Sequence, residues 1–310
     1  MTLTSSKPAT AVEPSAAPKA PKQRPLRDIR PGETDELVSL LASASMMLAL
    51  LCVWFLVQVL VLGGVSEGRA QHLLYTKYRG ELAAQTAPTG PVVKPGRPVA
   101  VISVPSLGID QVVVEGTAAG DLLAGPGHRR DTALPGQQGV SLVYSRGGTY
   151  GAPLAGVEKL HPGDPIEVTS GQGKLRYTVV GVRRAGDPVP AFPTGTTSRL
   201  TITTSTGDGP MASLRASSVV SVDAEADKGF PAPAGRPSAV PPSEQAMATS
   251  NGALPVLVLA LALLIGCSLV MSAARRRWSA AVVWVVTTPV VLALAWFTTE
   301  AAMRMLPNLM

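Results

Sequence analysis

The sequence predicts an all-β folded domain held at a membrane by three transmembrane α-helices, one near its start and two near its end. The 310-residue chain is 46% hydrophobic but only 15% charged, and its apolar residues gather in three long runs. The region between these runs consists of short β-branched stretches separated by glycine, proline and aspartate, which is typical of strands and turns. A chain of this length has room for one modest domain once the membrane segments and tails are set aside.

The first apolar run follows a polar tail. Residues 1–35 are rich in Pro, Ala, Ser, Lys and Arg, a composition that buries too little apolar surface to fold, so we expect a disordered tail. Residues 37–62 contain no charge and, as a helix, are long enough to cross a hydrocarbon core about 30 Å thick. A cleaved signal peptide is the alternative, which the long tail and the long apolar run both disfavour.

Two further apolar runs, residues 254–274 and 278–297, are separated only by Arg275, Arg276 and Arg277. This pattern predicts a helical hairpin whose arginine turn faces the cytoplasm. The basic tail places the start of the chain on the same side, so the β region and the last residues are expected outside a plasma membrane that the chain crosses three times. A buried helical pair in a soluble domain is the alternative, which the lengths of the runs disfavour.

Cysteine and histidine are scarce. Cys52 and Cys267 are the only cysteines and both lie in predicted spans, so the external domain has no thiolate, disulfide or cysteine metal site. The only histidines are His72, His128 and His161. We therefore predict no metal and no cofactor. The net charge of +6 owes much to the tail and the arginine turn, which indicates anionic lipid rather than nucleic acid as the partner.

The β region is framed by two connecting segments. Residues 67–84 have helix-forming composition, and residues 86–97 are rich in proline and glycine, as linkers are. The even spacing of the strand-like stretches favours a barrel or a sandwich. The expected strands are 99–104, 111–115, 140–144, 165–169, 174–182, 200–204 and 219–222.

These observations divide the chain into nine consecutive segments. They are a cytoplasmic tail at 1–35, a first span at 36–64, a membrane-proximal helix and linker at 65–97, a β domain at 98–226, a linker at 227–251, a second span at 252–274, a cytoplasmic turn at 275–277, a third span at 278–299 and an external tail at 300–310.

Four strings in the β domain point to a family. They are VISVPSLGI at 101–109, GPGH at 125–128, TYGAPL at 149–154 and LTITT at 200–204. In this order and spacing they resemble those of bacterial sortases, the cell-surface transpeptidases of Gram-positive organisms. The resemblance implies a closed, eight-stranded β-barrel. It also implies an enzyme whose cysteine cuts a sorting-signal peptide, holds it as a thioacyl intermediate and passes it to an amine.

The sequence departs from the family at the catalytic positions. Ser145 stands where the family has its histidine, and Ser205 follows the LTITT strand where the family has its cysteine. The resemblance assigns the surviving arginine to Arg215, a candidate for recognising a peptide carbonyl or carboxylate. A surface charge on a β strand is the simpler interpretation of this residue. A serine is a poor nucleophile without a base within hydrogen-bond reach, and none is evident beside Ser205. His128 is a candidate base or peptide contact, although a structural role is the simpler interpretation.

The sequence thus favours a degenerate sortase without catalytic activity, which binds or assembles surface-protein sorting peptides or other membrane proteins. One alternative is a divergent peptidase or transpeptidase with Ser205 as nucleophile and Arg215 as oxyanion stabiliser. Another is a purely structural subunit of a membrane complex. The expected partners are the cell membrane and such peptides or proteins, and no nucleic acid.

Overall fold

The computed structural model describes five parts of the chain. They are Val38, Ser45 and residues 49–207, 218–274 and 277–310. The predicted tail at 1–35 and the predicted arginine contact Arg215 lie outside the described residues.

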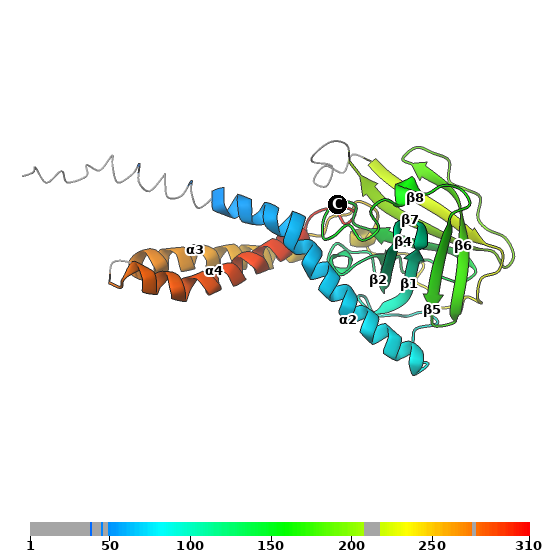
Figure 1. The fold of residues 1–310 in the computed structure, drawn as a ribbon, viewed down its shortest axis with the longest axis horizontal. Helices are drawn as coiled ribbons and strands as arrows, with labels where there is room; N and C mark the ends of the chain where they lie inside the picture. Colours follow the sequence, from blue (N-terminus) through cyan, green and yellow to red (C-terminus); the bar gives the residue numbers. More distant parts are fainter. Residues whose placement is uncertain (1–37, 39–44, 46–48, 208–217, 275–276) are drawn as a thin grey trace, which may run out of the picture. The chain divides into compact units, whose positions relative to one another are not determined.

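The β domain is a closed barrel with the strand order β1-β2-β3-β4-β7-β8-β6-β5 (Figure 1). The predicted all-β barrel is therefore confirmed, and the sandwich alternative is not. The strands are β1 (Pro98–Val104), β2 (Ile109–Glu115), β3 (Gly127–His128), β4 (Gly139–Ser145), β5 (Pro165–Ser170), β6 (Gly173–Arg184), β7 (Ser198–Thr206) and β8 (Ser218–Ala226).

Most neighbouring strands of the barrel pair antiparallel, and β1 closes the sheet by pairing with β5. The parallel pairs are β2 with β3 and β4 with β7. Because parallel strands end at the same edge of a sheet, the last residues of β4 and β7 lie next to each other. This pairing positions the candidate site.

The barrel interior is filled by the β-branched residues that predicted the strands. In β5 burial alternates along the strand, with Ile166 and Val168 fully buried and their neighbours partly exposed. Ile102 of β1 and Ile202 of β7 belong to the same core cluster. Each such side chain contributes about 1.5–3 kcal/mol when fully buried, so a single closed core accounts for much of the barrel's stability.

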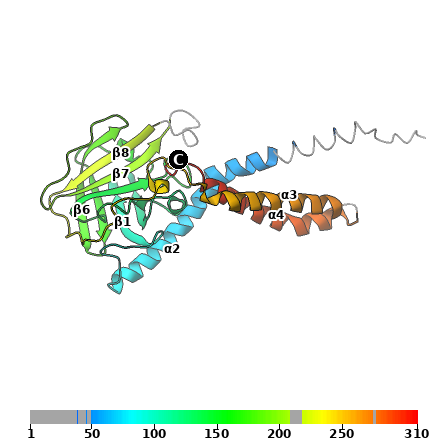
Figure 2. The ribbon, with the colours of Figure 1, turned by 180° about the vertical axis from the view of Figure 1, so that it is seen from behind.

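Three described helices are long and apolar enough to cross a membrane. They are Ala49–Ala83, Asn251–Met271 and Ala281–Met303. The first contains a π-helical turn at Gln58–Leu62, after which it continues as α2 (Gly63–Ala83). The other two correspond to α3 (Leu254–Ala274) and α4 (Ala280–Met303), which pack side by side in both views (Figures 1 and 2).

Helix α2 is bound to the barrel by hydrogen bonds from polar side chains. The Gln71 amide donates to the carbonyl oxygens of Val112 and Ala124 at 3.1 and 2.7 Å and accepts from the Val112 amide at 2.7 Å. The Tyr78 hydroxyl donates to the Val99 carbonyl at 2.8 Å. The helix that follows the first span is therefore part of the folded domain.

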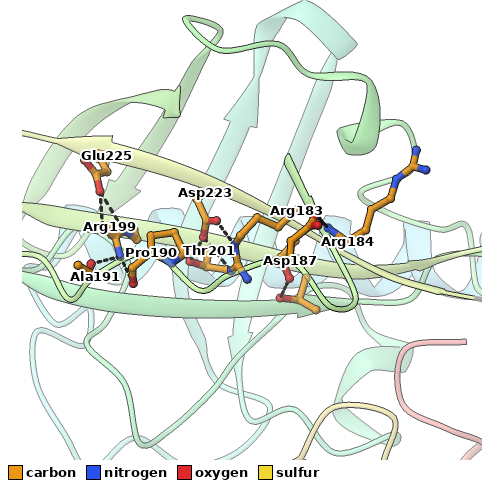
Figure 3. Close-up of polar contacts among 11 residues, drawn as sticks. Arg183, Arg184, Asp187, Pro190, Ala191, Arg199, Thr201, Asp223 and Glu225 are labelled. Carbon is orange, nitrogen blue, oxygen red and sulfur yellow. Dashed lines mark hydrogen bonds and ion pairs between the residues drawn. The ribbon is translucent and has the colours of Figure 1, made fainter. Parts of the chain in front are cut away.

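Two ion pairs link strands of the barrel, and the arginine of one of them also contacts the loop between β6 and β7 (Figure 3). Arg199 on β7 donates to the Glu225 carboxylate on β8 at 2.6 and 2.8 Å and to the Ala191 carbonyl in the loop at 2.7 Å. Two residues before Glu225 on β8, Asp223 is paired with Arg183 of β6. Arg199 thus holds the loop against β7, and the pair of Arg183 with Asp223 links β6 to β8.

The buried hydroxyl of Tyr177 holds the turn before β4 and the start of β7 together, and its removal tests how much these hydrogen bonds stabilise the barrel. It accepts from the Gly136 amide at 2.9 Å and lies 2.7 Å from the Ser198 hydroxyl, which itself donates to the Gln137 carbonyl. We expect Tyr177→Phe to lower the unfolding free energy of the full chain by about 1–2 kcal/mol, because the buried Gly136 amide loses its acceptor.

Urea denaturation of the detergent-solubilised chain measures this effect. Tyr75→Phe, on the exposed face of α2, is the matched control and should change the unfolding free energy by less than about 0.5 kcal/mol. Equal effects of the two substitutions would show that the Tyr177 hydroxyl does not hold the barrel together.

Candidate functional site

The parallel pairing of β4 with β7 brings Ser145 and Ser205 to one edge of the barrel. Ser145 is the last residue of β4 and lies opposite Thr204, the neighbour of Ser205 on β7. Both serines are buried, with 0% and 4% of their surface exposed. Two residues far apart in the sequence thus meet at the end of two strands.

The chain leaving β4 passes directly against Ser205. A Cβ atom added to Gly147 would lie 1.8 Å from the carbonyl oxygen of Ser205 and 2.7 Å from its hydroxyl oxygen. No side chain fits between these two backbones, so Gly147 is required for the approach. On its open side, Ser205 lines a cavity of about 170 Å³ together with Glu158 and Gly207.

Both serine hydroxyls donate to main-chain carbonyls. Ser205 donates to the main-chain carbonyl of Leu309 at 2.5 Å, and Ser145 donates to the carbonyl of Arg146 at 3.2 Å. Among the described residues, no histidine or carboxylate is hydrogen-bonded to either hydroxyl. A serine in this setting has no partner that would take its proton during an attack.

His128 lies on β3 and is engaged elsewhere. One ring nitrogen contacts the Glu115 carboxylate at 2.9 Å, and the other lies 2.8 Å from the Ala133 carbonyl and 3.0 Å from the Thr132 hydroxyl. The side chain is 1% exposed. The structure therefore places His128 in the connection between β2, β3 and the loop that follows, and does not bring it to Ser205.

The other candidates are peripheral or undescribed. His72 and His161 are exposed, and Arg215 falls in the undescribed stretch 208–217. Within the described part of the chain, no group of three or more His, Cys, Asp or Glu side chains is placed to hold a metal ion.

Arg146, which the sequence did not single out, is the best-connected polar residue of the site. Its guanidinium is fully buried and donates to the main-chain oxygens of Ala119, Met303 and Met310 at 2.9, 3.2 and 2.9 Å. It also donates to the Thr149 hydroxyl at 3.2 Å. A lone arginine after a strand is usually a surface residue, so the sequence around Arg146 gave no sign that its side chain is buried.

The charge of Arg146 is stabilised by main-chain dipoles. Burial lowers the pKa of the guanidinium to about 10, which still leaves it protonated near neutral pH. Met303 is the last residue of α4, and the C-terminal end of a helix carries partial negative charge. The Tyr150 ring lies 5.7 Å from the guanidinium carbon, within the range of a cation–π contact.

A structural role for His128 predicts a loss of stability. We expect His128→Ala to lower the unfolding free energy by about 2–3 kcal/mol, because it leaves the buried Glu115 carboxylate and Ala133 carbonyl without a partner. His161→Ala, in an exposed turn, is the control and should have an effect below about 0.5 kcal/mol. Thermal unfolding of the two variants measures the difference, and similar melting temperatures would argue against a structural role.

The region that contains Ser145 and Ser205 is similar to known proteins. The family model described as "Sortase domain" matches residues 102–216. A sortase D5 transpeptidase of Clostridium perfringens is 20% identical over 52% of this chain and 97% of its own, with a TM-score of 0.41. Sortase E of Streptomyces avermitilis is 29% identical over 45% of this chain and 93% of its own, with a TM-score of 0.36.

Sortase A of Corynebacterium diphtheriae is 18% identical over 51% of this chain and 82% of its own, with a TM-score of 0.35. No curated protein matches the chain. The region that the family model covers runs from β1 past the end of β7 and includes both Ser145 and Ser205. Residues 102–216, which hold most of the β-barrel, are similar to a sortase domain.

Proposed function

We propose that this chain is a membrane-anchored, catalytically inactive sortase domain that binds or assembles surface-protein peptides at the outer face of the plasma membrane. The observation that carries the proposal is the environment of Ser205. Its hydroxyl donates to the main-chain carbonyl of Leu309. A serine that acts as a nucleophile would instead donate its proton to a base.

The chemistry of the family depends on groups that act together. A nucleophile attacks the peptide carbonyl, an acid protonates the leaving amine, and a donor stabilises the oxyanion. Position 145 and position 205 are serines, and both ring nitrogens of His128 are engaged elsewhere. Among the described residues, no histidine or carboxylate is hydrogen-bonded to either serine hydroxyl. The donors that remain can still bind a peptide main chain.

The membrane arrangement supports a location outside the cytoplasm for the barrel. Three helices are long and apolar enough to span a membrane. The basic residues before the first of them, and Arg275–Arg277 between the last two, place both of these segments in the cytoplasm by the positive-inside rule. The sortase domain then lies on the opposite side, close to the bilayer.

Assays of the full chain with a panel of fluorogenic sorting-signal peptides test the absence of catalysis. We expect the wild type and Ser205→Ala to show the same background rate, because the Ser205 hydroxyl donates to the Leu309 carbonyl and to no base among the described residues. The combined Ser205→Cys and Ser145→His variant is a positive control for a retained groove. Cleavage by the wild type that Ser205→Ala abolishes would contradict the proposal and favour a serine mechanism.

A further inference from the structure

The sortase site of this chain is occupied by part of the chain itself. Residues 306–310, which we call the plug segment, follow α4 and enter the barrel edge beside Ser205, where Figures 1 and 2 mark the end of the chain. We propose that the plug segment is the resident ligand of this site and must leave before another peptide can bind there. This inference deepens the proposed function and depends on it only for the identity of the competing ligand.

The site binds the plug segment through successive main-chain carbonyls. The Leu309 carbonyl accepts from the Ser205 hydroxyl at 2.5 Å and from the Gly147 amide at 2.9 Å. The Met310 oxygen accepts from the Arg146 guanidinium at 2.9 Å and from the Thr149 hydroxyl at 2.6 Å. Each carbonyl thus receives two donors from the turn after β4 or from β7. Recognition of main-chain atoms does not depend on side chains, so a different extended peptide can compete for the same donors.

Two side chains of the plug segment add selectivity. Leu309 is fully buried and packs with Leu122 and Tyr144. The Asn308 amide donates to the carbonyls of Thr117 and Gln245 at 2.8 Å each. A polar contact at Asn308, followed along the chain by an apolar contact at Leu309, gives a groove the means to distinguish peptides.

The plug segment is also a partner that the buried charge of Arg146 requires. Among the described residues, no Asp or Glu side chain forms an ion pair with this arginine, whose acceptors come from Thr149, Ala119, Met303 and Met310. Removing a partner from a buried charge is strongly unfavourable, so an empty site would favour any peptide that restores the missing oxygen. Because Met303 ends α4, the same arginine joins the third membrane helix to the site.

Peptide binding to a shortened chain tests the inference. The probe is a fluorescein-labelled peptide copying residues 304–310, and the variant lacks the plug segment. We expect the variant to bind the probe at least about tenfold more tightly than the wild type, in which the resident segment competes. Equal affinities would overturn the proposal.

Substitutions in the shortened chain identify the anchor. Arg146→Gln should weaken binding of the probe at least about tenfold, whereas Arg176→Gln, a matched change on the exposed side of β6, should leave it unchanged. Equal behaviour of the two variants would also overturn the proposal. The same shortened chain is titrated with sorting-signal peptides. If they fail to bind while the probe binds, the proposed function fails and the resident-ligand inference stands.

A second measurement covers the case in which the shortened chain does not fold. Hydrogen exchange of the Gly147 amide, which the Leu309 carbonyl protects, is compared in full-length Leu309→Asp and Val189→Asp. Val189 is 78% exposed and serves as the control. We expect exchange at least about tenfold faster in the first variant only, and unchanged exchange would show that the segment is not seated there.

Discussion

The buried guanidinium of Arg146 is the constraint on which the rest of the site depends. Moving a charge out of water costs several kcal/mol unless polar groups replace the lost solvent. Here the replacements come from the loop before β3, the end of α4, the turn after β4 and the plug segment. These parts of the chain converge on one side chain, so the barrel edge, the third membrane helix and the plug segment are energetically linked.

This linkage also involves Ser205 and its neighbour Gly147. The hydroxyl of Ser205 and the amide of Gly147 meet a single carbonyl, in an arrangement similar to the paired donors that stabilise an oxyanion. In this structure the two donors hold the Leu309 main-chain carbonyl. We propose that this site binds a peptide and leaves it intact, as a binding or assembly subunit would.

Much of the fold could be predicted from the sequence, because each expected strand is a β-branched run bounded by turn residues and each span exceeds the length of an ordinary core helix. The two-residue strand β3 was missed because so short a stretch has no periodicity. The proximity of Ser145 and Ser205 followed only from the family resemblance. The role of Arg146 could not be foreseen, because its partners Met303 and Met310 are 157 and 164 residues away in the chain.

The accessibility of a thiol at position 205 tests most directly whether the plug segment covers the site. Ser205→Cys is introduced into the full chain, and into one lacking residues 306–310, after Cys52 and Cys267 are replaced by serine. Maleimide labelling of the thiol should be at least about tenfold slower in the full chain, while an exposed Ala185→Cys control labels equally in both. Equal labelling at position 205 would contradict the account, because the segment would then not occupy the sortase site.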